Sequence, residues 1–403
     1  METFLVGGAV RDHLLGLEII DRDWVVVGGT PEQMINMGFK PVGKDFPVFI
    51  KPGSGEEYAL ARTERKTAKG YQGFAFNTSP NITLEEDLER RDLTINAMAQ
   101  APDGSIIDPF NGQKDLKTKT LRHVSDAFIE DPVRILRIAR FAARFDFEVA
   151  DETMQLMKSM VENGEVDALV AERVWAEFHK ALSTERPRKF IEVLYNCGAL
   201  ARILPEVHAL FGIPQPEQHH PEIDTGIHTL MVLEQACILS SDPIVRFAAL
   251  MHDLGKAKTP KDEWPRHIGH EQLGVAVIHG LCQRLRVPTK FRELACIVSE
   301  YHLKMHRLSE LKNTTILKLL ESTGSLRNEE RAKHFVFACE ADAKGRAGLE
   351  NRDYPQRDLF FSYLAAANSV DSQAIAKQFD NGAAIKDAIR RARIQAIAVI
   401  KKA

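Results

Sequence analysis

The segment GGAVRDHLLGLEIIDRDWVVV, residues 7–27, constrains the fold more than any other part of the chain. Asp21 and Asp23 are separated by one residue and lead into the sequence WVVV, whose β-branched and aromatic side chains favour a strand. Side chains i and i+2 of a strand share a face, so both carboxylates are expected to point the same way. Two acids that close repel each other unless a cation lies between them. Mg²⁺ fits this position, because it binds proteins through one or two carboxylates together with substrate phosphates.

A glycine pair and an arginine lie upstream of these acids. Gly7 and Gly8 allow backbone N–H groups to approach an anion, and Arg11 adds a rigid fork of donors. An isolated Asp-x-Asp is more often a solvated edge at the start of a strand. In combination with the glycines and Arg11, the segment predicts a site for a metal ion and a nucleotide.

Composition limits the classes of protein to which the chain belongs. Its 403 residues are enough for two to four domains, since single cores stop growing near ~250–300 residues. A net charge of −3 argues against binding of nucleic acid by overall charge, although it is compatible with a local basic stripe. The five cysteines form no C-x-x-C pair and are typical of reduced, mostly buried thiols. We expect no signal peptide, and no apolar run approaches ~18 residues, so we expect a cytoplasmic protein that does not contact a membrane.

The pattern of apolar residues changes along the chain. Up to about residue 125, short strand-like runs alternate with helical stretches, which predicts a mixed α/β domain. Beyond Asp126 helical periodicity dominates, and the three prolines of residues 211–226 indicate a linker or an extended crossing. The expected divisions are residues 1–125, an α/β head; 126–215, a helical neck and body; 226–345, a His-rich helical domain; and 346–403, a helical tail.

The sequence RRDLTINAMA, residues 90–99, is a second chemical motif. Asp92 followed by Thr94-Ile95-Asn96 resembles a helix start, with Arg90 and Arg91 directly before it. A helix N-terminus beside Arg91 is a natural triphosphate site. The alternative is a capping aspartate with solvated arginines, and the residues alone do not decide between the two.

The sequence EDPVRILRIARFAARF, residues 130–145, is a third motif. Asp131 is placed to cap a helix that has Pro132 in its first turn. Four arginines then recur at helical spacing and form one basic stripe: Arg134, Arg137, Arg140 and Arg144. Asp131 and Arg134 together suit the Watson–Crick edge of cytosine or adenine, because the carboxylate accepts from an exocyclic amine that uracil lacks and guanine replaces with O6.

These motifs, with AERVWAE at residues 171–177, resemble the class II tRNA nucleotidyltransferases, the CCA-adding enzymes. The resemblance covers the first half of the chain and implies a polymerase β-like head on a helical neck, body and tail. It also implies addition of C, C and A to a tRNA 3′ end from CTP and ATP, without a nucleic-acid template. Two metal ions would assist the attack of the tRNA 3′-hydroxyl on the α-phosphate.

The resemblance also implies roles for individual residues. Asp21 and Asp23 would bind Mg²⁺, and Gly8, Arg11 and Arg91 would hold the nucleotide phosphates and sugar. Asp131 and Arg134 would read the base, with Arg137 and Arg140 completing the nucleotide site. Glu172 and Arg173 resemble a motif that braces this helix, although Arg173 and Glu177 also suit an ordinary i,i+4 pair. Glu57 is our candidate for a third carboxylate, with a surface acid as the alternative.

Histidines dominate the second half of the chain. His228 comes first, His252-Asp253 follows an apolar run in FAALMHDLGK, and Asp342 comes much later, which resembles the HD phosphohydrolase pattern. Imidazole and carboxylate ligands together suit a transition metal such as Ni²⁺, which would assist hydrolysis of a phosphate ester. His270 and His302 are candidates for a second metal or for groups that support the first, and HHPEID at residues 219–224 is expected to be a loop.

The two halves together most resemble the bacterial multifunctional CCA-adding enzymes. For the HD domain this resemblance implies phosphatase, 2′-nucleotidase and 2′,3′-cyclic phosphodiesterase activities that repair tRNA ends. The alternatives are a bacterial poly(A) polymerase, an A-only adding enzyme, and a binding protein with a degenerate site. The expected partners are tRNA, CTP and ATP, and the chain is expected to be a monomer or a homodimer.

Overall fold

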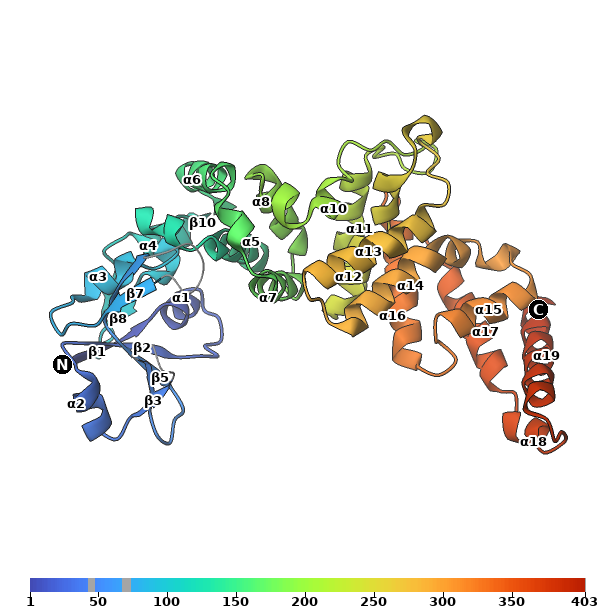
Figure 1. The fold of residues 1–403 in the computed structure, drawn as a ribbon, viewed down its shortest axis with the longest axis horizontal. Helices are drawn as coiled ribbons and strands as arrows, with labels where there is room; N and C mark the ends of the chain where they lie inside the picture. Colours follow the sequence, from blue (N-terminus) through green and yellow to red (C-terminus); the bar gives the residue numbers. More distant parts are fainter. Residues whose placement is uncertain (43–47, 67–73, 403) are drawn as a thin grey trace. The chain divides into compact units, whose positions relative to one another are not determined.

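The structure is a computed structural model that describes residues 1–42, 48–66 and 74–402. It divides into two compact units (Figure 1). The first unit comprises Met1–Ala181 and Lys189–Ile203, and the second comprises Leu182–Arg188 and Leu204–Ala403.

The first unit contains a mixed sheet whose seven strands lie in the order β3-β4-β5-β2-β1-β8-β9. β2 and β5 are parallel, and the other neighbours are antiparallel. The strands are β1 (Glu2–Val6), β2 (Asp23–Val27), β3 (Lys40–Val42), β4 (Val48–Ile50), β5 (Glu57–Leu60), β8 (Ala99–Gln100) and β9 (Ile106–Ile107). Two further pairs are β6 (Thr63–Lys66) with β7 (Phe74–Asn77) and β10 (Thr120–Leu121) with β11 (Glu148–Val149).

Both faces of this sheet are covered, which explains the uninterrupted apolar run in β2. Val25 packs with Leu88 of α3 (Leu84–Glu89) on one face. Val26 packs with Met34 of α2 (Pro31–Asn36) on the other. A strand that is buried on both faces needs apolar side chains at successive positions.

The pairing of β1 with β2 places two predicted motifs at one edge of the sheet. The strands are antiparallel, and Val6 lies opposite Asp23. Gly7 and Gly8 directly follow β1, so the turn that leads into α1 (Gly8–Leu14) lies beside the start of β2. Strand register thus brings together residues that lie fifteen or more positions apart in the sequence.

The arginine-rich segment forms α5 (Val133–Phe145), which buries Ile135, Leu136 and Ile138. Asp131 Oδ1 accepts from the Val133 N–H at 3.1 Å and so caps the first turn, although Pro132 rather than Asp131 is the residue directly before the helix. The other helices of this unit are α4 (Gly112–Lys117), α6 (Asp151–Glu162), α7 (Ala171–Leu182), α8 (Pro187–Asn196) and α9 (Ala199–Ile203). Short 3₁₀ turns occur at η1 (Thr94–Asn96), η2 (Asp126–Glu130) and η3 (Glu165–Ala168).

The regular elements of the second unit are all helical among its described residues. Its helices are α10 (Pro205–His208), α11 (Thr225–Leu239), α12 (Pro243–Met251), α13 (His270–Arg284), α14 (Thr289–His306), α15 (Asn313–Ser322), α16 (Glu329–Lys344), α17 (Gln356–Asn368), α18 (Ser372–Ala376) and α19 (Gly382–Lys402), with 3₁₀ turns η4 (Leu254–Lys258), η5 (Lys261–Glu263) and η6 (Leu308–Glu310). α12 packs against α11, α14 and α16, and α13 packs against α14 and η4. Small side chains at this crossing, including Ala236, Ala249 and Ala341, allow the helices to approach closely.

An α/β head followed by helices confirms the predicted fold class. The structure divides into two compact units, and the four-part division stays a prediction. No helix among the described residues is long and apolar enough to span a membrane. All five cysteines are free, and Cys197, Cys282 and Cys339 are buried.

Candidate nucleotide pocket and candidate metal centre

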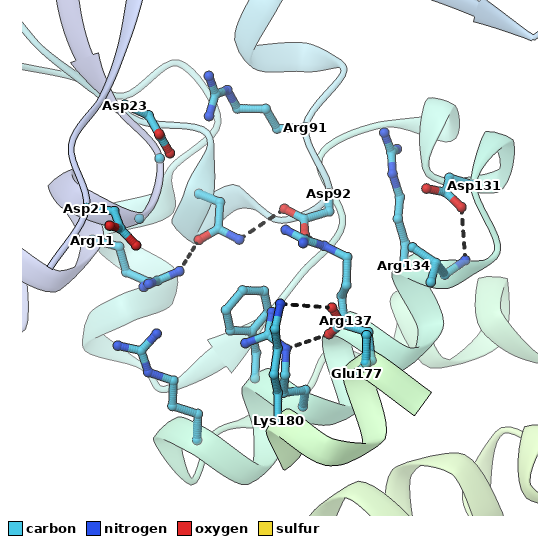
Figure 2. Close-up of a pocket in the computed structure, with 18 of the residues that line it drawn as sticks. Arg11, Asp21, Asp23, Arg91, Asp92, Asp131, Arg134, Arg137, Glu177 and Lys180 are labelled. Atoms are coloured by element: carbon cyan, nitrogen blue, oxygen red, sulfur yellow. Dashed lines mark hydrogen bonds and ion pairs between the residues drawn. The ribbon is translucent and has the colours of Figure 1, made fainter. Parts of the chain in front are cut away.

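One cavity of about 900 Å³ in the first unit collects nine of the residues predicted for nucleotide transfer in the head and neck. These lining residues are Gly8, Arg11, Asp21, Asp23, Arg91, Asp131, Arg134, Arg137 and Arg140. Asp21 and Asp23 lie on one side of the cavity and Asp131 and Arg134 on the other (Figure 2). The two predicted subsites are therefore separate ends of one pocket.

The two aspartates begin the strand rather than both lying within it. β2 starts at Asp23, and Asp21 precedes it, so the strand expectation holds for only one of the pair. Both carboxylates still line the pocket. Burial and the neighbouring Asp21 raise the pKa of Asp23, whereas Arg91 opposes the shift. A cation between the acids would relieve the cost of keeping both charged.

The glycine turn leaves room for the arginine opposite it. Gly7 has φ of +68°, and a Cβ there would come within 2.9 Å of Arg91 Nη1. Any other residue would be strained in this conformation and would push Arg91 away. The side chain of Arg91 is anchored on Asp87 at 3.2 Å and faces the pocket.

Arg11 is more buried than the sequence indicated. It is only 3% exposed, and Nη1 donates to Asn96 Oδ1 at 2.6 Å. Its neighbour Asp12 accepts from Nε at 2.8 Å. The guanidinium also lies over the rings of Phe141 and Phe145. Arg11 thus supports the wall of the pocket as well as lining it.

Three of the four arginines in the predicted stripe on α5 form ion pairs with carboxylates. The ion pairs are Arg137–Asp92 at 2.7 Å, Arg140–Glu177 at 2.5 Å and Arg144–Asp12 at 3.0 Å. The acids come from other elements, so the local sequence did not reveal them. The pocket therefore holds its arginines in fixed positions, which favours recognition of a defined ligand over loose attraction of a polyanion.

Asp131 and Arg134 point into the pocket but are held by different groups. Asp131 receives two hydrogen bonds from Arg173, at 3.1 and 2.7 Å. Arg134 donates to the carbonyls of Ala127 and Arg90 at 2.8 and 2.7 Å. Arg173 on α7 thus orients the cap of α5, which agrees with the bracing role that the resemblance implied.

The prediction that an α-helix starts after Asp92 is wrong. The segment forms only the three-residue 3₁₀ turn η1 and then enters β8. Asp92 Oδ1 accepts from the Leu93 N–H and from Asn96 Nδ2, which closes a tight turn instead of starting an α-helix. Although burial opposes its charge, Arg137 lowers the pKa of Asp92 to about 2.

Glu57 lies beside Asp23 in the parallel register of β2 and β5 and is exposed, and its metal role stays a prediction.

The four residues predicted to bind a metal in the second unit converge. His228 Nε2 lies 3.2 Å from Asp342 Oδ1, and His252 Nε2 lies 3.1 Å from Asp253 Oδ2. His228 belongs to the first turn of α11. His252 and Asp253 follow the end of α12, and Asp342 comes from the last turns of α16.

The histidines of this cluster share one hydrogen-bonding arrangement. Each Nδ1 lies within hydrogen-bond distance of a backbone carbonyl, at 2.9 Å for His228, 2.8 Å for His252, 2.8 Å for His270 and 2.9 Å for His302. Donation from Nδ1 fixes the tautomer that leaves Nε2 as a metal ligand. His228 Nε2, His252 Nε2 and Asp253 Oδ1 are buried without a hydrogen-bond partner among the described residues.

Asp253 joins two groups of histidines. Its Oδ2 faces His252, and its Oδ1 lies 3.3 Å from His270 and 3.8 Å from His302. Gly255 makes this possible, because a Cβ there would come within 1.9 Å of the His270 carbonyl oxygen. Only glycine lets η4 approach the start of α13 this closely. The arrangement suits a bridging carboxylate between two metal ions.

The electrostatics of the cluster favour a cation. Burial disfavours a charged imidazole, but Asp253 and Asp342 raise the pKa of His252 to about 10. Burial also opposes the charge of Asp253, but His252 and Lys256 hold its pKa well below the usual value. By contrast, burial lowers the pKa of His302 to about 3. A transition-metal ion that takes the place of the His252 proton would be bound by carboxylates and neutral imidazoles at one buried point.

Several supporting residues were missed by sequence reasoning. The 219–224 segment is a loop as expected, yet its Glu222 is 3.0 Å from His228 Nδ1 and from His220 Nδ1. Lys256 Nζ is 2.6 Å from Asp253 Oδ2, and His306 Nε2 is 2.6 Å from Asp342 Oδ2. The dense run of histidines and acids was the only sequence signal for them. His267 has both ring nitrogens near backbone or hydroxyl oxygens, so it is structural.

Comparison with known proteins covers both units. A family model for the poly A polymerase head domain matches residues 3–122, one for a probable RNA- and SrmB-binding site of polymerase A matches residues 146–211, and one for the HD domain matches residues 225–343. A multifunctional CCA protein of Teredinibacter turnerae is 58% identical over 406 residues, which cover 100% of this chain and 99% of the relative.

Solved structures share the fold. A CCA-adding enzyme in complex with CTP has a TM-score of 0.64 and 22% identity, covering 98% of this chain and 87% of the other. A Thermotoga maritima CCA-adding enzyme complexed with tRNA has a TM-score of 0.64 and 20% identity, covering 98% and 87%. At these identities the likeness is one of fold.

Proposed function

Because the chain belongs to the family of multifunctional CCA proteins, we propose that it adds C, C and A to the 3′ end of tRNA from CTP and ATP. The observation that supports this most directly is the gathering of nine motif residues in one 900 Å³ cavity. In the reaction, the tRNA 3′-hydroxyl oxygen bonds to the α-phosphorus, the bond from that phosphorus to the bridging oxygen breaks, and pyrophosphate leaves. The hydroxyl proton passes to solvent.

The residues of the pocket divide this work. Asp21 and Asp23 would hold Mg²⁺, which supplies Lewis acidity to the phosphates when bound. Arg91 and the glycine turn, at the same end of the pocket, suit the triphosphate. Asp131 and Arg134, at the other end, suit the edge of cytosine or adenine. Arg173 keeps Asp131 in position, and ion pairs keep Arg137 and Arg140 in place.

The second unit suits a separate hydrolytic activity on phosphate esters, with a 2′,3′-cyclic phosphate or a 2′-phosphate as substrate. Support comes from the histidines whose Nε2 atoms face a common point beside Asp253 and Asp342. A transition metal such as Ni²⁺ would activate water there. His228, His252, Asp253 and Asp342 would hold one ion, and Asp253, His270 and His302 a second. In hydrolysis the water oxygen bonds to phosphorus, one bond from phosphorus to a ribose oxygen breaks, and that oxygen takes up a proton.

Incorporation of single nucleotides into tRNA transcripts tests the first activity. Transcripts that lack the last three, two or one nucleotides are incubated with Mg²⁺ and each labelled nucleoside triphosphate. We expect CMP, CMP and AMP to be added in that order, with UMP and GMP excluded. A long tail of AMP would instead identify a poly(A) polymerase. Addition of AMP to the transcript ending in CC, with no CMP added to the two shorter transcripts, would identify an A-only adding enzyme.

A further inference from the structure

A larger cavity adjoins the metal cluster of the second unit. The cluster opens into a cavity of about 180 Å³ that Asp253, His270, His302 and Asp342 help to line. Beside it lies a cavity of about 560 Å³, and the two have His219, His220, Leu303 and Arg346 as common walls. A volume in the range of ~300–1,000 Å³ is typical of sites for small organic ligands. The smaller cavity has room for reacting groups, and the larger one for the rest of a substrate.

Arg346 stands at the boundary of the two cavities. Its Nη2 is 3.6 Å from Asp342 Oδ1, the same oxygen that faces His228 and His252. Its Nη1 donates to the His219 carbonyl at 3.4 Å, and its Nε is buried without a hydrogen-bond partner among the described residues. The guanidinium therefore keeps donor capacity beside the metal cluster. Arginine offers such donors in pairs to phosphate oxygens.

The larger cavity combines positive charge with apolar surface. Lys304, Arg307 and Arg352 line it together with Arg346, and Glu271 is the acidic side chain among its lining residues. Arg307 is paired with Glu310 at 2.8 Å, which leaves Lys304 and Arg352 as the better phosphate contacts. Leu303, Leu311 and Ala343 add apolar wall. Charges spread around an apolar wall suit a nucleotide with more than one phosphate better than a lone phosphate.

We propose that this cavity binds the 3′-terminal nucleotide of an RNA strand. Arg346 holds the phosphate on the terminal ribose beside the metal cluster, the apolar wall contacts the base, and Lys304 and Arg352 contact the preceding backbone phosphate. The proposal rests on the proposed hydrolytic function, because it names the substrate class of that site. It makes Arg346 necessary for every phosphate ester and makes Lys304 and Arg352 necessary only for oligonucleotides.

Binding and hydrolysis are measured separately on the full-length, nickel-loaded protein. The binding probe is a fluorescent cytidine dinucleotide that ends in a 3′-phosphorothioate, and its 3′-hydroxyl counterpart is the control ligand. Hydrolysis is followed with a dinucleotide 2′,3′-cyclic phosphate and with p-nitrophenyl phosphate. The variants are Arg346→Ala, Arg346→Lys and the double variant Lys304→Ala/Arg352→Ala. Arg327→Ala, an exposed arginine outside both cavities, is the matched control.

We expect Arg346→Ala to weaken binding of the phosphorothioate by about 10- to 100-fold, as for loss of one charge-assisted contact, and to lower kcat/KM for both esters. Arg346→Lys should recover part of the loss. The double variant should raise KM for the dinucleotide about tenfold and leave p-nitrophenyl phosphate unchanged. Arg327→Ala should match the wild type in every assay.

Two results would overturn the proposal. One is unchanged binding in the Arg346 and double variants. The other is loss of nickel from Arg346→Ala, measured by elemental analysis, because Arg346 would then support the metal rather than the substrate. If the wild type binds the probe through Arg346 but hydrolyses neither ester, the hydrolytic function fails and the binding site stands.

Discussion

The two candidate sites of this protein use charge in opposite ways. The nucleotide pocket is large, its Asp21 and Asp23 are exposed, and three arginines of its α5 are paired with carboxylates from other elements. The metal cluster is small, and His228, His252, Asp253 and Asp342 are each at most 3% exposed. The pocket suits a ligand that brings its own metal and charge, whereas the cluster is built to retain a metal ion. One chain can therefore hold two sites for reactions at phosphate that have no residue in common.

The strongest test of this comparison is the independence of the two sites. Asp21→Ala should lower nucleotide incorporation about a thousandfold or more, since it removes a group that holds Mg²⁺, and should leave hydrolysis of cyclic phosphates unchanged. Asp253→Ala should do the reverse. Both activities are measured on the same preparations. If each variant loses both activities, the two sites are not separate.

Metal retention sharpens the difference between the sites. After loading with Ni²⁺ and gel filtration, the wild type should keep the metal, because several buried ligands bind it. His228→Ala should lose most of it, with an affinity reduced about a hundredfold or more. Asp21→Asn should retain as much as the wild type. Equal retention by His228→Ala and the wild type in elemental analysis would place the metal elsewhere.

Base selection is confined to the nucleotide pocket. Asp131→Asn or Arg134→Ala should reduce the preference for CTP and ATP over UTP and GTP by about 10- to 100-fold, the worth of a bidentate contact to a base. Arg173→Lys should have a smaller effect, because it only loosens the position of Asp131. Ratios of kcat/KM for the four nucleotides provide the measurement. Variants that are slower but equally selective would remove this pair from base reading.

The ion pairs of α5 should differ in their effect on stability. Arg140 and Glu177 are 11% and 10% exposed, and Arg144 and Asp12 are 37% and 11% exposed. Arg140→Ala leaves a largely buried carboxylate and should cost about 1–3 kcal/mol. Arg144→Ala should cost about 0–1 kcal/mol, because Arg144 is more exposed and Asp12 keeps its ion pair with Arg11. Chemical unfolding of the full chain compares them, and equal midpoints would show that burial of the pair does not matter.

Many residues of both sites could be predicted from short segments of the sequence. The Asp-x-Asp before WVVV, the arginine helix with its Asp131 cap, and the His252-Asp253 pair each carry their signal within a few residues. Helix and strand periodicity also predicted the α/β head and the helical remainder, because burial of one face leaves a regular apolar pattern. The turn at Asp92 was missed, because the hydrogen bonds that its side chain accepts from Leu93 and Asn96 compete with the helix.

The local sequence did not predict which charged side chains form ion pairs with each other. Arg140 pairs with Glu177 and Arg137 with Asp92, although the residues of each pair lie dozens of positions apart in the sequence. The local sequence does not distinguish these two acids from the many others in the chain. Glu222 and His306 likewise reach the metal cluster from separate elements. Such contacts depend on helix crossings and strand register, which no local pattern specifies.

The sequence by itself determined which chemical groups the protein has and which family it resembles, because the order and spacing of the motifs are properties of the linear chain. The tertiary structure alone decided that nine motif residues share one cavity, that histidine Nε2 atoms face one point, and that Arg346 stands between that point and a second cavity. The physical reason is that side-chain direction and hydrogen-bond tautomer are set by packing, and packing brings together residues that are distant in the chain.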